Sequence, residues 1–599
     1  MFKRKFQLTY SCLGKKNKKL FFTTLFLSLL SSLVDSLSIT SIFPFLSLIL
    51  DESLLATNKY YSYVFNLFEF DVKNFIVFSG ITFLVLALLN VTLRFLSKVS
   101  IEYFSRHINY ELSTNLYKFY LFQPYKFYLK NNKALLTQKS TQYVDSLIAG
   151  VLAPAIRIFY LLINISLLFF VFVFLNFKVT IFLTIFLILY YILFFKNITS
   201  KFKKAGREYE HFQAQSTKTM LDSFNIIKQL QTLFKQNFFI DIYSNLAKKY
   251  RNAYITQFLF GTLPLYVIEI VLFTFVVFIS LYFYLYSSDY KTIIPLIVFF
   301  LLALRRIIPS AQEIYYDILQ IKFHEKTSSK IFKDVKAMKY FQNFQKRNTK
   351  KINFKNEIEF RKVKFTYDKG KRNFNFNVKI KRGDFIGVAG KSGNGKSTFI
   401  NILCGFLEPQ KGQLKVDNQI INSSNLKSWR EKLGYVPQEV SLVNDTIKRN
   451  ITLEQTSDNK KNKFLKNLNK MLNINFSNSK KFENNLKEKI GHRGFNLSGG
   501  QQQRISIARS LSKNPEVIIF DEATSSLDFE SEYKILSNIK KKFKNATFIV
   551  CTHRLQTLKK CDTILYFKNN TIKRNCNFNK MVEVERDFLN SLKSIKKDF

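Results

Sequence analysis

The sequence of 599 residues predicts a helical membrane domain with six transmembrane spans, followed by an α/β domain with a phosphate-binding loop. Two observations support this fold class. Apolar runs of about 20 residues recur in the N-terminal half, whereas short apolar strands and a glycine-rich loop follow residue 357. A chain of this length should form at least two domains. We expect a membrane domain at 1–325, a connection at 326–356 and an α/β domain at 357–599.

Six apolar segments each have about the 20 residues that are needed to cross a hydrocarbon core of ~30 Å. An even number of spans places both ends of this region on the same side of the membrane. The N-terminus and two long polar connections are basic, which predicts that this side, with both termini, is cytoplasmic. The predicted spans lie at 20–45, 75–97, 151–175, 179–196, 257–286 and 292–309, and the basic connections at 98–140 and 196–251.

Positive charge is in large excess, with 91 Lys and Arg against 42 Asp and Glu and a formal net charge of +49. Such a surplus can indicate nucleic-acid binding, but six predicted spans argue decisively against that class, and we expect no nucleic-acid partner. The cytoplasmic face of a membrane favours Lys and Arg, which lie mostly outside the apolar segments. The five cysteines form no CxxC pair and have no histidines at metal spacing, so we expect them to be reduced.

A phosphate-binding loop, GKSGNGKS, occupies residues 390–397 and matches the pattern G-x-x-x-x-G-K-[ST]. It follows an apolar strand and precedes a helix-like segment. Its glycines let backbone N–H groups turn toward phosphate oxygens, and the helix directs its positive end at the same point. Lys396 should reach the β- and γ-phosphates, and Ser397 should ligate Mg²⁺. The predicted nucleotide-binding residues here are Gly390, Lys391, Ser392, Gly393, Asn394, Gly395, Lys396, Ser397 and Thr398.

Two acids end the apolar strand VIIFDE, which lies downstream of this loop. Asp521 should hold Mg²⁺ through its water shell, and Glu522 is suited to act as general base toward an attacking water. His553 closes the next apolar strand and is expected to contact the γ-phosphate, and Gln438 can reach the metal and the water. Adjacent acids can also form a solvated turn, and a lone histidine is usually structural. The phosphate loop upstream favours the catalytic interpretation.

A second glycine-rich motif, LSGGQ, occupies residues 497–501 and begins a helix-like segment. A helix N-terminus binds anions through its dipole and its free N–H groups, so the motif predicts a second anion site. Each chain has one phosphate loop and therefore holds one nucleotide there. We expect the second site to contact a nucleotide held by another copy of the chain, through Leu497, Ser498, Gly499, Gly500 and Gln501.

In this combination and order, the motifs resemble those of the ATP-binding cassette (ABC) family, over essentially the whole chain. The resemblance implies an exporter half-transporter that binds ATP and Mg²⁺ and acts as a homodimer, with LSGGQ completing the ATP site of the other chain. It also implies that Tyr367 stacks on adenine and that Asp528 belongs to the D-loop. The segments 122–132 and 219–231 resemble coupling helices. His492 departs from the family, because exporters usually have a glutamate there that contacts the inner loops.

The membrane domain further resembles bacterial flippases that turn over polyprenyl-diphosphate-linked oligosaccharides. The resemblance lies in SLVDSLSITSIFPF at 32–45, in the aromatic outer segment at 53–70 and in LALRRIIPSA at 302–311. It implies a protein of the bacterial cytoplasmic membrane, surrounded by membrane lipids, that takes a lipid-linked substrate. A general lipid or multidrug exporter of the same architecture is the alternative.

The same resemblance implies a set of substrate contacts. Arg306 would face the pyrophosphate, and Arg94 lies one turn from a second such position. Tyr61, Phe65 and Phe68 in the outer segment would face the lipid tail, since an amphipathic element there can lie on the membrane surface. For the arginines, snorkelling or an internal ion pair is the alternative, and for the outer segment an ordinary structured loop.

Overall fold

The computed structural model describes residues 15–585, apart from positions 54, 56–58, 69–70, 176, 287–289, 345–349, 368–371, 455–458, 475–485, 492–493, 495 and 525. His492 therefore lies outside the described residues. The chain forms two compact units. Unit 1 consists of Met1–Gln123 and Lys130–Gln345, and unit 2 consists of Pro124–Leu129 and Lys346–Phe599. The boundary near residue 345 lies within the predicted connection.

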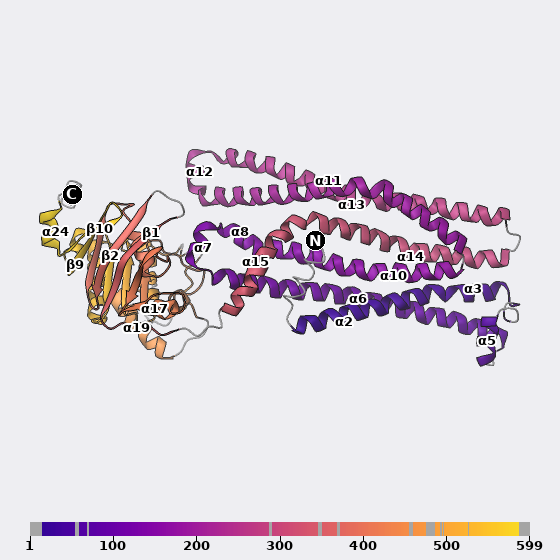
Figure 1. Ribbon diagram of the computed structural model, residues 1–599, viewed down its shortest axis with the longest axis horizontal. Coiled ribbons are helices and arrows are strands. Elements are labelled where there is room, and N and C mark those ends of the chain that lie inside the picture. The colour runs from indigo at the N-terminus through magenta and orange to yellow at the C-terminus, as the bar shows by residue number, and fades with distance from the viewer. Residues whose placement is uncertain are drawn as a thin grey trace. The chain divides into compact units, whose positions relative to one another are not determined.

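Every regular element described in unit 1 is a helix (Figure 1). This agrees with its apolar sequence, because a helix satisfies its own backbone hydrogen bonds inside a membrane. The short helix α7 (Tyr125–Lys130) lies almost entirely in unit 2. The helices of unit 1 are α2 (Lys15–Thr40), α3 (Ile42–Leu50), α5 (Lys59–Phe68), α6 (Val72–Leu121), α8 (Lys133–Gln138), α9 (Val144–Leu147), α10 (Ala153–Leu175), α11 (Phe177–Asn225), α12 (Ile227–Leu233), α13 (Gln236–Tyr286), α14 (Tyr290–Phe323) and α15 (Glu325–Phe344), with π-helical η1 (Lys139–Tyr143) and η2 (Ile148–Leu152).

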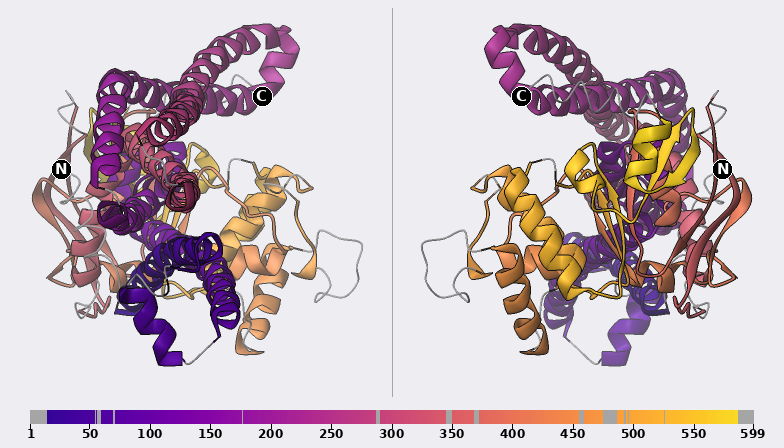
Figure 2. Two further views of the ribbon diagram at one scale, coloured as in Figure 1. Left: turned by 90° about the vertical axis from the view of Figure 1, so that its right-hand side faces the viewer. Right: turned by 90° about the vertical axis from the view of Figure 1, so that its left-hand side faces the viewer.

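Three of these helices are much longer than a membrane is thick. Helices α6, α11 and α13 have 50, 49 and 51 residues. At ~1.5 Å per residue each is about 75 Å long, against a hydrocarbon core of ~30 Å. The polar connections therefore continue the predicted spans as helices. Helices α2 and α6, α10 and α14, and α11 and α13 pack as neighbours, and Figure 2 shows unit 1 along its helices.

Helices cover all six predicted spans in the described residues. Three stretches are long and apolar enough to cross a membrane: Asn17–Leu50, Val72–Leu121 and Lys133–Phe174. This statement concerns only the residues that the structure describes. The helical membrane fold is confirmed, whereas the count of six spans stays a prediction.

The aromatic outer segment forms helix α5, but two of its predicted lipid contacts face the protein. Tyr61 and Phe65 pack against a cluster of Leu48, Leu55 and Phe75. The rings of Phe65 and Phe75 lie 5.5 Å apart, and burial raises the pKa of the Tyr61 hydroxyl. The side chain of Phe68 lies outside the described set. Among the α5 side chains that the structure describes, Tyr63 and Val64 are exposed and apolar, because a helix turns neighbouring residues to different faces.

Unit 2 contains a ten-stranded mixed sheet in its described residues, in the order β5-β4-β1-β2-β10-β9-β3-β8-β7-β6. Strands β9, β3, β8, β7 and β6 run parallel, whereas β1, β2, β4 and β5 pair antiparallel. The strands are β1 (Glu357–Thr366), β2 (Asn373–Lys381), β3 (Phe385–Gly390), β4 (Lys411–Val416), β5 (Gln419–Ile420), β6 (Leu433–Val436), β7 (Val517–Asp521), β8 (Thr547–Cys551), β9 (Thr563–Lys568) and β10 (Thr571–Cys576).

The parallel strands are buried on both faces. Ile518 and Phe520 of β7 enter one apolar cluster, while Val517 and Ile519 enter another. Helices cover these faces, which explains why the strand reads as a continuous apolar run. The α/β prediction for this part of the chain is confirmed. The helices are α16 (Lys396–Leu403), α17 (Leu426–Glu431), α18 (Ile447–Thr452), α19 (Asn459–Leu472), α21 (Gly499–Leu511), α22 (Phe529–Lys542), α23 (Leu555–Leu558) and α24 (Phe578–Val584).

Candidate nucleotide-binding site

The phosphate-binding loop connects β3 to α16, and its glycines are required by its shape. Gly390 has φ +145°, and a Cβ there would lie 2.4 Å from the carbonyl oxygen of Phe567. Gly395 has φ +97°, and a Cβ would lie 2.7 Å from a ring carbon of Phe374. Asn394 fixes the loop by donating to the Phe567 carbonyl at 3.1 Å. Only glycine fits both positions, so the loop can turn its N–H groups inward, as a phosphate requires.

A cavity of about 600 Å³ lies against this loop. Polar and aromatic side chains share its walls, which suits a ligand with both a charged and a planar part. The Tyr367 hydroxyl lies 3.3 Å from Thr398 Oγ1, and the ring is about 40% exposed, so a planar base can reach it. The lining residues are Tyr367, Arg372, Phe374, Ser392, Gly393, Gly395, Lys396, Ser397, Thr398, Gln438 and Glu522.

The predicted catalytic side chains converge on Glu522. Gln438 Nε2 donates to Glu522 Oε2 at 2.8 Å, and His553 Nε2 lies 3.3 Å from Oε1. Lys396 Nζ donates to the Gly390 carbonyl at 2.6 Å and lies 3.4 Å from His553 Nε2. Glu522 has a left-handed backbone with φ 52°, a conformation that costs energy for a residue other than glycine and is often found at functional sites.

Asp521 ends β7 and accepts a hydrogen bond from the Tyr435 hydroxyl at 3.1 Å. Burial raises the pKa of the Asp521 carboxyl, the Tyr435 hydroxyl opposes this rise, and the neighbouring Glu522 adds to it. A hydroxyl, an amide oxygen and a carboxylate form an oxygen donor set, which is what Mg²⁺ prefers. The chemistry of Ser397, Gln438 and Asp521 therefore fits the predicted metal site.

LSGGQ forms the N-terminus of α21 and is closed by a capping box. The Ser498 hydroxyl accepts from the Gln501 N–H at 3.3 Å, and Gln501 Oε1 accepts from the Ser498 N–H at 2.8 Å. Leu497 packs on the apolar cluster below it. Gly499 and Gly500 begin the helix. Among the described residues that line the nucleotide cavity, none comes from LSGGQ, called the signature motif below, so the chain's own phosphate loop and signature motif are not brought together there.

Asp528, which the sequence analysis assigned to a D-loop, is a helix cap. Its Oδ2 accepts from the Ser531 N–H at 2.9 Å and begins α22. That backbone bond lowers the pKa of the Asp528 carboxyl. This cap gives Asp528 a structural role in the described chain, and a role toward a second nucleotide stays a prediction.

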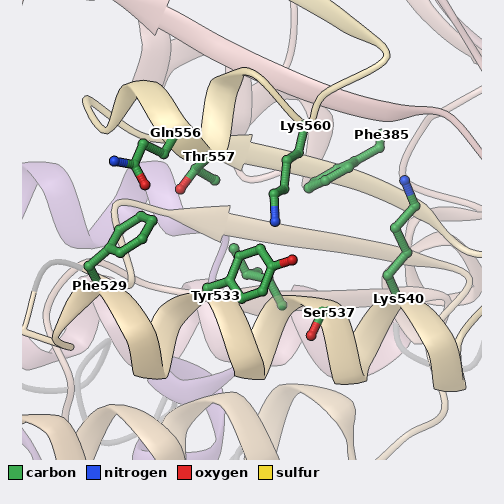
Figure 3. A pocket seen from close by; sticks show the side chains of 9 residues that line it. Phe385, Phe529, Tyr533, Ser537, Lys540, Gln556, Thr557 and Lys560 are labelled. Atoms are coloured by element: carbon green, nitrogen blue, oxygen red, sulfur yellow. The ribbon is translucent and has the colours of Figure 1, made fainter.

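A second cavity of unit 2, of about 130 Å³, is shown in Figure 3. Lys560 Nζ lies 3.1 Å from the centroid of the Tyr533 ring, and Lys540 Nζ lies 4.6 Å from that of Phe385. Its described lining contains neither a carboxylate nor the phosphate-binding loop. It is a smaller, mainly apolar cavity and does not replace the nucleotide site.

The structure pairs Arg306 of unit 1 with a carboxylate. Arg306 Nε donates to Asp35 Oδ2 at 2.7 Å, and the Asp35 side chain is about 1% exposed. Asn164 and Asn90 donate to the same carboxylate, each at 2.7 Å. The internal ion pair is thus found at Arg306, while Arg94 is partly buried on α6.

Several of these contacts join residues that are far apart in the sequence, and no local motif predicts them. Tyr435 lies three residues before Gln438 in the same YVPQE segment, but nothing local shows that its hydroxyl reaches Asp521. Arg372 and Phe374 line the cavity from the start of β2. An acid within a predicted span was the only available signal for the Asp35 contact.

The fold and this site define a helical membrane unit joined to a nucleotide-binding unit. Comparison with known families gives two matches: "ABC transporter" over residues 374–525 and "ABC transporter transmembrane region" over residues 21–308. Together they cover most of the chain. The chain belongs to the ABC transporter family, with one transmembrane region followed by one nucleotide-binding unit.

Individual proteins give similar results. An ATP-dependent lipid A-core flippase of Wigglesworthia glossinidia brevipalpis is 39% identical over 230 residues, 38% of this chain and 39% of that protein. The alpha-hemolysin translocation ATP-binding protein HlyB of Escherichia coli O157:H7 is 38% identical over 222 residues, 36% of this chain and 30% of that protein. The chain thus spans about a third of the length of these curated relatives.

A solved structure extends the likeness in fold to the whole chain. It is described as a bacterial Atm1-family ABC exporter with ATP bound, and it matches with a TM-score of 0.74 and 20% identity. The match covers 96% of this chain and 98% of that chain. At this identity it shows the fold alone.

Proposed function

We propose that the chain is one half of an ATP-driven exporter, which acts as a homodimer in the bacterial cytoplasmic membrane with both termini inside. The observation that carries the proposal is the carboxylate of Glu522, held between Gln438 and His553 beside the phosphate-binding loop. The names of the relatives, a lipid A-core flippase and a hemolysin translocation protein, are consistent with export.

The side chains of the nucleotide site have distinct tasks in this proposal. Lys396, now bonded to the Gly390 carbonyl, can turn its ammonium to the β- and γ-phosphate oxygens of ATP. Glu522 accepts the proton of the attacking water. His553, 3.3 Å from Glu522, can hold the γ-phosphate from the other side. When bound, Mg²⁺ neutralises phosphate charge, and Ser397, Gln438 and Asp521 would hold it.

The second chain completes the site. Because α21 begins at Gly499 behind the Ser498 cap, its dipole and free N–H groups can bind a γ-phosphate. Since the signature does not line the cavity of its own chain among the described residues, we assign it to the nucleotide of the partner. Two identical chains then form two equivalent sites.

We further propose that the cargo is a polyprenyl-diphosphate-linked oligosaccharide. An anion that crosses the protein interior needs fixed positive charge, and a guanidinium has five N–H donors that match phosphate oxygens. The bond from Arg306 to Asp35 uses Nε. No bond of its Nη groups is found within the described part of the chain. On α5, the exposed Tyr63 replaces Tyr61 and Phe65 as the side chain offered to a lipid tail.

The test must separate substrate binding from the ion pair, because Arg306→Gln alone leaves the buried Asp35 without its cation. We would compare Arg306→Gln with the double variant Asp35→Asn/Arg306→Gln, which removes both charges. Flipping of a fluorescent lipid-linked oligosaccharide and ATP hydrolysis are measured in the same proteoliposomes. If Arg306 binds the pyrophosphate, flipping is lost in both variants, while basal ATP hydrolysis persists in the double variant.

Three other results would contradict the proposed cargo or the proposed activity. Recovery of flipping in the double variant would assign Arg306 a purely structural role. A wild-type protein that moves phospholipids or drugs but no polyprenyl-diphosphate glycan would favour the general exporter. Absence of ATP hydrolysis in the wild type would contradict the proposed activity as a whole.

A further inference from the structure

Tyr435 contacts the nucleotide site through Asp521. It lies on β6, which pairs in parallel with β7, and its hydroxyl donates to Asp521 Oδ2 at 3.1 Å. The ring is only partly exposed. This bond occupies one oxygen of the carboxylate and restricts its rotation, and such partners of metal-binding carboxylates orient them.

The same ring belongs to a short aromatic stack. The Tyr435 and Phe406 centroids lie 5.7 Å apart with the planes at 74°, and the Phe406 and Tyr125 centroids lie 5.5 Å apart. Both separations are typical of favourable edge-on or tilted contacts. Tyr125 begins α7, and Pro124–Leu129 belongs to unit 2 although it follows α6 in sequence.

Phe406 has a third neighbour, Arg430. The Arg430 guanidinium carbon lies 5.2 Å from the Phe406 centroid. Arg430 also donates to the carbonyls of Cys404 at 3.2 Å and Gly405 at 2.6 Å, at the end of α16. A ring that packs against three side chains can pass a displacement of one neighbour on to another, because packed side chains leave little free volume.

We propose that Tyr435 is a positioning residue that orients Asp521 for Mg²⁺, and that the Tyr125–Phe406–Tyr435 stack makes this orientation depend on the segment Pro124–Leu129. The inference rests on the proposed nucleotide site but concerns metal affinity, not turnover. Tyr435 would therefore act on the Mg²⁺ requirement of the site without touching nucleotide.

The experiment measures nucleotide affinity with and without Mg²⁺ on the purified full-length protein, using a fluorescent ATP analogue, together with Mg²⁺ titrations of ATP hydrolysis. Tyr435→Phe keeps the ring and removes the hydroxyl. It should raise the half-saturating Mg²⁺ concentration about tenfold, leave binding without Mg²⁺ unchanged, and recover most of kcat at saturating Mg²⁺. Tyr533→Phe, which removes an exposed hydroxyl on α22, is the matched control.

The stack is tested by a double-mutant cycle. Tyr125→Leu should raise the half-saturating Mg²⁺ concentration in the wild-type background but add nothing in Tyr435→Phe, since coupled positions are not additive. Leu129→Ala, an exposed change on the same helix, should leave it unchanged. Additive effects of Tyr125→Leu and Tyr435→Phe would refute the dependence on this segment.

The outcomes distinguish this inference from the proposed function. If Tyr435→Phe weakens nucleotide binding equally with and without Mg²⁺, its role is general folding and the inference is wrong. The inference is also wrong if the wild-type protein shows Mg²⁺-dependent binding and Tyr435→Phe leaves it unchanged. A wild-type protein without Mg²⁺-dependent nucleotide binding would contradict both the inference and the proposed activity.

Discussion

Replacing Glu522 by Gln tests the assignment of the general base. The structure makes this change nearly isosteric, because Glu522 Oε2 accepts from Gln438 at 2.8 Å and Oε1 lies 3.3 Å from His553. The amide oxygen of a glutamine can still accept from Gln438, and its NH₂ group can face His553 Nε2. Geometry and ATP binding should therefore persist while the basic oxygen is lost. A general base contributes about 10²- to 10⁴-fold, so kcat should fall by about that factor.

The assay is phosphate release at saturating MgATP, with binding of a fluorescent ATP analogue measured in parallel. Glu530→Gln is the matched control, because Glu530 is an exposed acid of the same unit that bonds only to Lys534 among its described contacts. The control should keep wild-type turnover. Turnover of Glu522→Gln within tenfold of the wild type would refute the assignment, as would a large loss of ATP affinity, which would show that the carboxylate serves binding.

Three further predictions concern the same unit. Ser498→Arg should abolish ATP hydrolysis but not ATP binding. When Ser498→Arg chains are mixed with Lys396→Ala chains, each mixed dimer should have one site with both changes and one site with neither, and the second site should hydrolyse ATP. Loss of hydrolysis in every dimer would contradict action in trans. Chelation of Mg²⁺ with EDTA should stop hydrolysis while nucleotide binding remains measurable, and hydrolysis that persists would exclude a metal requirement. Glu532→Ala removes the buried acceptor of Arg554 and two threonine hydroxyls and should cost about 3 kcal/mol of stability, seen as a lower melting temperature than that of Glu530→Ala.

Much of the nucleotide site could be predicted because its motifs are local. The strand, glycine turn and helix of the phosphate loop follow one another within residues 385–403. The residues that form this part of the site are therefore neighbours in the sequence as well as in space. Glu522 and His553 could be placed because each follows an apolar strand, and the carboxyl ends of parallel strands meet at one edge of the sheet. These predictions needed only the strand assignments.

Contacts set by tertiary packing were not predictable in this way. Tyr435 reaches Asp521 only because β6 pairs with β7 in one register, in which Tyr435 lies opposite Ile519. For the outer segment, the aromatic pattern predicted an amphipathic element, but not which side chains meet the protein. The packing of Tyr61 and Phe65 on Phe75 depends on how the chain returns after the loop, and no local spacing encodes that.

Two arginines of unit 1 form ion pairs with buried carboxylates. Arg157 pairs with Asp317 and Arg306 with Asp35, and both carboxylates are about 0–1% exposed. Removing one partner from such a pair is strongly unfavourable, because it leaves a buried charge uncompensated. The two arginines are therefore neutralised within the bundle, and the surplus of +49 must come from residues elsewhere. An anionic cargo that binds Arg306 of α14 must either share this guanidinium with Asp35 of α2 or replace Asp35 as its partner. Binding of the cargo and the contact between α14 and α2 are therefore linked.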